Sequence, residues 1–148
     1  MSKSTFVYVT FIRTTPAKAW EALTDPQVIR QYWFGMTIES GWTKGSPWKM
    51  ARPDGTLMDS GEILEADPPR RMVIKWRHQW DQELKAEGDS FCTFELEPVP
   101  DVDPKVVKLS ITHSLDRPDS KLIHKVSGGW PRILSNLKSL LETGERIL

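Results

Sequence analysis

Two histidines occupy positions from which an imidazole could face the interior of a predicted sheet. His78 and His113 each fall on the apolar side of a segment with alternating apolar and polar side chains, residues 71–80 and 106–113. Neutral imidazole both donates and accepts a hydrogen bond near pH 7, so the pair could bind a ligand or exchange a proton with it. Alternatively, each ring lies near a strand end and meets solvent or a backbone carbonyl. The sequence leaves both interpretations open.

The other reactive residue types carry weaker signals. Cys92 and the two inward histidines lack the close spacing of a metal site, so no metal is expected. Cys92 falls on the apolar side of a predicted strand, where a thiol is usually a small buried hydrophobe. Ser127 belongs to no Gly-x-Ser-x-Gly motif, and Gly128-Gly129 lacks the further glycines of a nucleotide-binding loop. We expect Ser127 to cap a helix that starts at these glycines, and we expect no catalytic residue and no cofactor.

Seven tryptophans are the most unusual feature of the composition. Tryptophan is large and stiff, and its indole N–H needs a partner when it is buried. Trp20 and Trp130 fall on apolar helix faces, which favours core packing for both. The candidate pocket lining combines aromatic and apolar residues near the expected interior with the two histidines: Trp33, Trp48, Trp76, His78, Trp80, Phe94, Leu109, Ile111, His113 and Leu134. The alternative is that these residues fill a solid core.

Strands must position most of these residues. Alternating or β-branched segments separated by turn residues predict strands over 5–13, 36–40, 46–50, 57–66, 71–80, 90–97 and 106–113. Their one wet face and one dry face are typical of an antiparallel sheet. Residues 81–89 are polar and net acidic, and we expect a mobile loop there.

Three helices are predicted beside the strands. Thr15 and Asp25 are positioned to cap two short helices, 16–24 and 26–33, each with a proline in its first turn. A long C-terminal helix carries an apolar stripe from Trp130 to Leu141 and ends near Gly144. One strand, two short helices, about six strands and a long helix together predict an α+β fold, a bent antiparallel sheet around the C-terminal helix.

Length and charge limit the classes of function. The 148 residues fit one domain, 1–148. Twenty basic and twenty acidic residues balance, so no net charge indicates nucleic acid or an anionic membrane as a partner. No apolar run approaches the ~20 residues of a membrane span, and the first residues lack the apolar stretch of a signal peptide. The single cysteine fits a reducing compartment, so we expect a cytoplasmic protein without membrane insertion.

Several motifs together resemble one protein family. They are Pro16–Pro26 followed by Tyr32-Trp33, Gly61–Glu65 with Pro68–Arg71, Trp76, and Gly128–Trp130 before a leucine stripe. Their order and spacing resemble the heat-shock-protein-90 ATPase activator homologue family of the START/SRPBCC superfamily, whose fold is that of the birch-pollen allergen. The resemblance covers residues 5–142 and implies a seven-stranded helix-grip fold with a cavity between sheet and helix. Members include lipid and hormone carriers, aromatase/cyclases, and the C-terminal domain of the chaperone activator.

Three functions are compatible with these features. We favour non-catalytic binding of a hydrophobic, lipid-like or aromatic small molecule, because the inward face is rich in tryptophan and has few polar groups. The family name implies an alternative, a module that contacts a chaperone through the outer sheet face and loops. A cyclase or hydrolase would use His78 or His113 as a base within ~3 Å of the proton it removes. An exposed edge strand could pair with a second copy, so we expect a monomer or a weak homodimer.

Overall fold

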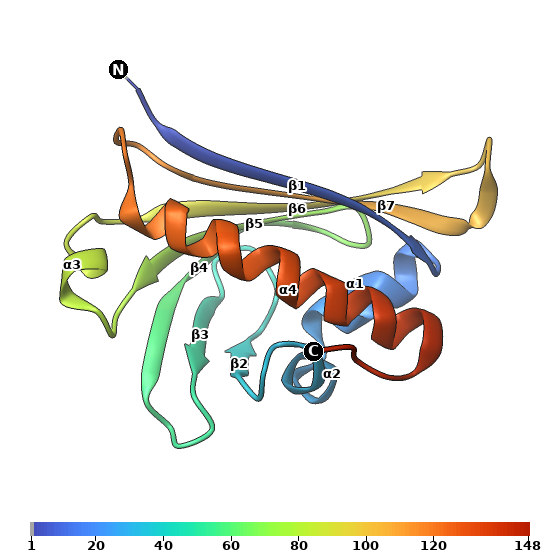
Figure 1. Ribbon diagram of the computed structural model, residues 1–148, viewed down its shortest axis with the longest axis horizontal. Helices are drawn as coiled ribbons and strands as arrows, with labels where there is room; N and C mark the ends of the chain where they lie inside the picture. Colours follow the sequence, from blue (N-terminus) through green and yellow to red (C-terminus); the bar gives the residue numbers. More distant parts are fainter. Residues whose placement is uncertain (1) are drawn as a thin grey trace.

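The computed structural model describes residues 2–148, apart from the side chains of residues 103 and 104, and confirms the α+β helix-grip fold (Figure 1). Seven antiparallel strands lie in the order β1-β7-β6-β5-β4-β3-β2, and the long helix α4 lies along one face of the sheet. The strands are β1 (Ser4–Arg13), β2 (Thr37–Ser40), β3 (Pro47–Ala51), β4 (Leu57–Asp67), β5 (Arg71–His78), β6 (Ser90–Val99) and β7 (Asp103–Leu115). The helices are α1 (Pro16–Thr24), α2 (Pro26–Tyr32), α3 (Gln82–Lys85) and α4 (Lys121–Thr143).

The first two helices begin where the predicted caps place them. Thr15 Oγ1 accepts a hydrogen bond from the backbone N–H of Lys18, and the Asp25 carboxylate accepts one from Gln27 N at 2.8 Å. A proline follows each cap, at a position where a backbone N–H would have no helical partner. Because Asp25 both ends α1 and caps α2, the helices follow each other directly, and Trp33 after α2 is buried.

Except for Trp80, the inward positions predicted for the central strands are buried. They form one continuous apolar layer on β5, β6 and β7: Met72, Ile74, Trp76, His78, Cys92, Phe94, Leu96, Val107, Leu109, Ile111 and His113. The polar residues between them face outward, where Arg71 forms ion pairs with Glu65 and Glu95. The alternation of the sequence therefore identifies the face of the sheet that α4 covers.

Gly61 allows the sheet to close tightly around two tryptophans. It lies opposite Trp48 on β3 and opposite Trp76 on β5. A Cβ at this position would lie 1.7 Å from the backbone oxygen of Lys75, so the close approach of the two strands requires glycine. The Trp48 and Trp76 rings pack with their centroids 4.4 Å apart.

Helix α4 begins well before the predicted start. Ser120 is its N-cap and accepts a hydrogen bond from Ile123 N at 3.1 Å, so the prediction that Ser127 caps a helix starting at Gly128-Gly129 is wrong. Both glycines, and Pro131, lie inside the helix. The first turn buries Leu122 and Ile123, and burying two such side chains stabilises the helix by more than two interior glycines cost, about 1 kcal/mol each. The helix ends as predicted at Gly144, whose φ of 87° is left-handed.

The segment 81–89 is not the open loop that its polarity suggested. It contains the short helix α3, and the Asp81 carboxylate caps it by accepting from Glu83 N at 2.9 Å. Leu84 is buried. Glu87 accepts hydrogen bonds from Ser120 Oγ and from Lys121 N, at 2.6 and 2.9 Å. These contacts attach the segment to the first turn of α4, which explains its order.

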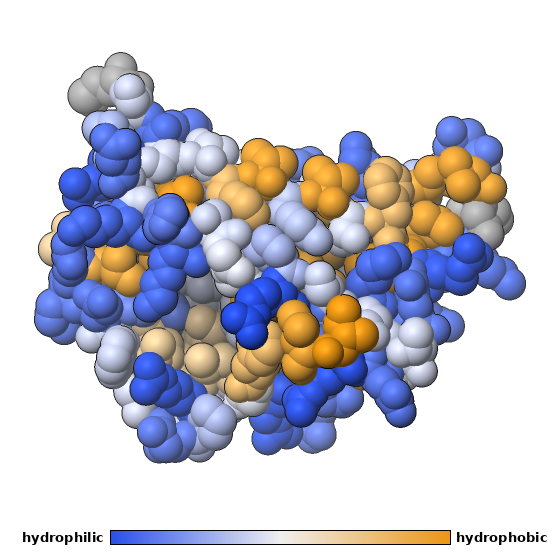
Figure 2. Space-filling view, in the orientation of Figure 1, coloured by the Kyte–Doolittle hydropathy of each residue, from blue (hydrophilic) through white to orange (hydrophobic). Residues whose placement is uncertain are grey.

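Strand β1 forms one edge of the sheet, and α4 covers part of that edge. Lys138 Nζ donates to the backbone oxygen of Phe11 at 2.7 Å, and Arg13 N donates to Glu142 Oε2 at 2.8 Å. The side chains of Val7, Val9 and Phe11 are exposed on the outer face, with exposed fractions of 57, 43 and 51%. Figure 2 shows hydrophobic side chains along the edge that β1 forms.

Candidate functional site

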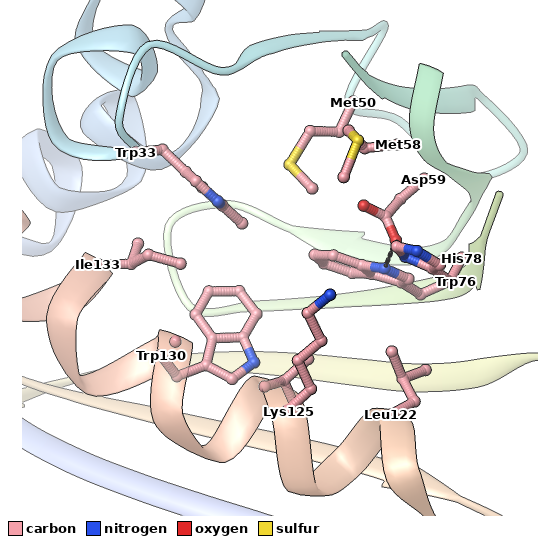
Figure 3. A pocket seen from close by; sticks show the side chains of 12 residues that line it. Trp33, Met50, Met58, Asp59, Trp76, His78, Leu122, Lys125, Trp130 and Ile133 are labelled. Carbon is pink, nitrogen blue, oxygen red and sulfur yellow. Dashed lines mark hydrogen bonds and ion pairs between the residues drawn. The ribbon is translucent and has the colours of Figure 1, made fainter. Parts of the chain in front are cut away.

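A pocket of about 200 Å³ lies between α4 and the strands β3, β4 and β5 (Figure 3). It is open on one side, and most of its wall is apolar. The lining residues come from the end of α2, from the three strands and from α4: Trp33, Met50, Met58, Asp59, Trp76, His78, Leu122, Lys125, Val126, Gly129, Trp130 and Ile133. The helix and the sheet thus leave room for a small molecule between them.

Three indoles form the rigid part of the wall. Trp33 and Trp130 meet edge to face with their ring centroids 5.1 Å apart, and Trp76 lies 6.2 Å from Trp33 and 5.9 Å from Trp130. These distances and tilts are those of favourable aromatic pairs, each contributing about 0.5–1.5 kcal/mol beyond its buried area. Aromatic side chains have few rotamers, so this wall keeps its shape when the pocket is empty.

A carboxylate and an imidazole form the polar end of the pocket. Asp59 Oδ1 accepts a hydrogen bond from Trp76 Nε1 at 2.9 Å and lies 2.9 Å from His78 Nδ1. The side chains of Asp59 and His78 are both about 6% exposed. An ionised carboxylate only accepts hydrogen bonds. Nδ1 therefore carries the ring proton and donates a hydrogen bond to Asp59. The other ring nitrogen, Nε2, is buried and has no hydrogen-bond partner among residues 2–148.

His113 has a different environment, behind the tryptophans. Trp130 Nε1 donates to His113 Nδ1 at 3.1 Å, His113 Nε2 lies 2.8 Å from Ser90 Oγ, and Ser90 Oγ donates to the backbone oxygen of Trp76 at 3.2 Å. A neutral ring protonated on Nε2 gives every group in this series of hydrogen bonds a partner. Burial lowers the pKa of His113 to about 4, so the ring is neutral at physiological pH.

Lys125 adds a positive charge at the opening. Figure 3 shows its side chain reaching from α4 into the pocket, with the ammonium group at its tip. The residue is exposed, so its charge remains hydrated while its stem covers apolar wall. Asp59 and Lys125 thus place opposite charges at the inner and outer parts of the pocket.

The structure brings only some of the predicted lining residues to this pocket. Trp33, Trp76 and His78 line it, whereas Trp48 and Phe94 line a second cavity of about 10 Å³, room for about one water. Leu109, Ile111, His113 and Leu134 are buried in the core away from both cavities.

Trp80 is the one predicted lining residue that lies at the surface. Its side chain is 49% exposed and stacks under the guanidinium of Arg52, 4.6 Å from the ring centroid. The inward assignment of Trp80 is wrong because β5 ends at His78, so the alternation does not extend two residues further.

The sequence did not predict most of the lining residues that α4 and β4 contribute to the pocket. Trp130 was assigned to the core, although it both packs there and faces the cavity. Asp59 carried no distinct signal, because its strand also contains Ser60, Glu62 and Glu65. Lys125 was missed because α4 was predicted to start later, and Gly129 because it was interpreted only as the start of that helix.

Cys92 lies outside this pocket. Cys92 is buried as predicted, and burial raises the pKa of its thiol. Among the residues that the structure describes, no group of three or more histidine, cysteine, aspartate or glutamate side chains could hold a metal ion. In the same part of the chain, no helix is long and apolar enough to cross a membrane.

Comparison with known proteins identifies the family. The sequence profile of activator of Hsp90 ATPase homolog 1-like proteins matches residues 13–142. The chain belongs to this family. No curated protein matches the chain significantly.

Solved structures of similar chains share the fold of this family member. A protein from Mesorhizobium loti superposes with a TM-score of 0.76 and 25% sequence identity, covering 93% of this chain and 96% of the other. The Aha1 dimer from Colwellia psychrerythraea has a TM-score of 0.75 at 20% identity over 95% and 98% of the two chains. An HSP90 activator from Plasmodium falciparum has a TM-score of 0.74 at 21% identity over 93% and 95%.

Proposed function

We propose that the chain binds a small aromatic molecule in the pocket between α4 and the sheet, without a catalytic step. The observation that carries this proposal is the open apolar pocket whose walls are the faces and edges of Trp33, Trp76 and Trp130. Indoles in such a pocket offer flat surfaces on which a planar ring can pack.

The pocket volume narrows the class of ligand. About 200 Å³ exceeds the roughly 150 Å³ of an engineered cavity that holds benzene, and it lies below the roughly 300–1,000 Å³ of sites for drug-sized ligands. One or two rings would fill it, whereas a fused polyketide or a long acyl chain would extend into solvent. The volume therefore favours the aromatic option over the lipid-like one.

Two neighbouring glycines offer a matched test of this proposal. Gly129 lines the pocket and Gly128 does not, and a Cβ on either would meet no atom within 4 Å. Gly129→Leu should fill the pocket and abolish saturable quenching of tryptophan fluorescence by naphthalene and indole derivatives. Gly128→Leu should bind like the wild type. Absence of quenching across a panel of aromatic compounds, flavonoids and lipids with the wild-type chain would contradict the proposal.

A co-chaperone-like interaction is the second candidate. Its support is the family membership, the likeness to a structure described as an HSP90 activator, and the exposed apolar side chains of Val7, Val9 and Phe11 on the outer face. A chaperone that used this face should lose binding to a Val9→Lys, Phe11→Lys variant in a pull-down with an ATPase assay. The pocket variant Gly129→Leu should keep it. No binding and no change in ATPase rate with the wild-type chain would remove this candidate.

An enzymatic function would depend on His78. Of the two inward histidines, only His78 lines the pocket, whereas both ring nitrogens of His113 are engaged in hydrogen bonds. A cyclase or hydrolase version of this site would therefore use His78 Nε2 as its base.

A further inference from the structure

The polar end of the pocket specifies the ligand further. We propose that the ligand carries an acidic hydroxyl group, a phenol or an enol, which donates its proton to His78 Nε2 inside the pocket. This inference rests on the proposed function, because it concerns the chemistry of a molecule bound at that site.

The first argument is the unsatisfied nitrogen. The His78 side chain is 94% buried, its Nδ1 is fixed by Asp59, and its Nε2 has no partner in the described part of the chain. With the proton on Nδ1, Nε2 of the neutral ring is an acceptor. Burying an acceptor without a hydrogen-bond partner is energetically unfavourable. Nε2 has almost no accessible surface in this structure, so a ligand reaches it only by displacing neighbouring side chains of the wall. A ligand hydroxyl that does so and donates a hydrogen bond to Nε2 removes that cost, so the site selects for a donor.

The second argument is the arrangement of charge. The charged residues that line the pocket are Asp59 from β4 and Lys125 from α4, and the nearby His113 of β7 is neutral and behind the tryptophans. An ionised carboxylate on the ligand would have no proton to donate to His78 Nε2. An ammonium group would have no lone pair with which to accept a hydrogen bond from Lys125. A neutral hydroxyl can donate to His78 Nε2 while its oxygen accepts from the Lys125 ammonium group.

The same charges stabilise the products of proton transfer. The proton leaves the ligand oxygen and binds His78 Nε2, and no other bond changes. The resulting imidazolium is paired with Asp59, and the resulting oxyanion faces Lys125, so positive and negative groups alternate through the site. Burial of both side chains strengthens the interaction of the imidazolium with Asp59. An aliphatic alcohol is too weak an acid to use this arrangement, which is why the ligand is expected to be a phenol or an enol.

The test compares two probes that differ by one methyl group. Nitrophenol has an ionisable hydroxyl, its ionised form absorbs at a longer wavelength, and the methyl ether, 4-nitroanisole, has no proton to donate. The wild-type chain should bind 4-nitrophenol about tenfold more tightly than 4-nitroanisole. Bound 4-nitrophenol should ionise at a pH about one unit lower than free 4-nitrophenol, as shown by its absorbance.

Three variants connect this shift to the pocket. His78→Gln should keep 4-nitroanisole binding and lose the shift. Lys125→Met, at an exposed position that the fold does not depend on, should reduce the shift without abolishing binding. His124→Gln, an exposed histidine of the same helix that is outside the pocket lining, should leave it unchanged.

The outcomes separate this inference from the function on which it rests. Equal binding of both probes, with 4-nitrophenol ionising as it does in free solution, would overturn the inference and leave aromatic binding intact. Binding of neither probe, together with no binding of naphthalene or indole, would overturn both.

Discussion

The two inward histidines are both buried and have opposite kinds of surroundings. His113 lies in a closed hydrogen-bond network. In it, Trp130, the imidazole, Ser90 and the backbone of Trp76 each have a hydrogen-bond partner. His78 lies in an open network, because Asp59 accepts a hydrogen bond from Nδ1 and no group of the described residues is a partner for Nε2. A closed network of buried polar groups specifies a core, whereas an open one leaves a place for a ligand. The number of partners, and not burial, distinguishes the structural histidine from the candidate functional one.

Removing His113 should have the largest effect on stability. His113→Ala leaves a cavity among the tryptophans and deprives the Trp130 N–H and one side of Ser90 of their partner. The two costs together give a loss of about 4 kcal/mol in the free energy of unfolding, measured by urea denaturation at pH 7. A loss below about 1 kcal/mol would show that the closed network does not stabilise the core.

Lowering the pH should test the same network without changing the volume of any side chain. Burial holds the pKa of His113 at about 4, below its ordinary 6.5, so the unfolded chain takes up this proton before the folded one. The stability associated with neutral His113 is complete above pH 6.5 and is lost as the pH falls to about 4, by about 3 kcal/mol in all.

The control for this pH dependence is His113→Gln, which has no titrating ring. The difference in unfolding free energy between wild type and His113→Gln, measured from pH 7 to pH 4.5, cancels the contributions of other groups. It should shrink as the pH falls. A difference independent of pH would mean that His113 takes up its proton over the same pH range in the folded and the unfolded chain.

Removing His78 should lower the free energy of unfolding much less than removing His113. In His78→Ala, Asp59 keeps its hydrogen bond from Trp76 Nε1, and the lost ring enlarges a pocket that already opens to solvent. We expect a loss of about 1 kcal/mol in urea denaturation at pH 7. If His78→Ala were as destabilising as His113→Ala, the contrast between the two histidines would be false.

The smallest change in the free energy of unfolding is expected for a substitution in α4, the helix that lines the pocket. Gly128 is exposed in the interior of α4 and has open space where a Cβ would lie. Gly128→Ala should raise the unfolding free energy by about 0.5–1 kcal/mol, because alanine loses less backbone entropy in a helix. Thermal unfolding followed by circular dichroism would show the gain as a higher Tm. An unchanged or lower Tm would mean that the helix requires glycine there for another reason.

The sequence predicted the fold and the inward positions of both histidines, because alternation and helical periodicity are local. It could not predict which imidazole is open. The partner of His78 is Asp59, which comes from β4, and the register of that strand shifts between Ile63 and Glu65. Such an irregularity leaves no mark in an alternating pattern. The start of α4 was missed for a related reason, since glycines and a proline usually mark a boundary and here lie inside the helix.

The interior of α4 also bears on how fast a ligand could enter and leave. Pro131 has no N–H to donate to the backbone oxygen of Ser127, and Gly128 and Gly129 add backbone freedom in the same turn. This turn, through Gly129 and Trp130, forms part of the pocket wall. We expect its amides to exchange with deuterated solvent faster than those of the turns on either side. Exchange of a bound molecule would then be timed by the opening of one helical turn, with the sheet unchanged.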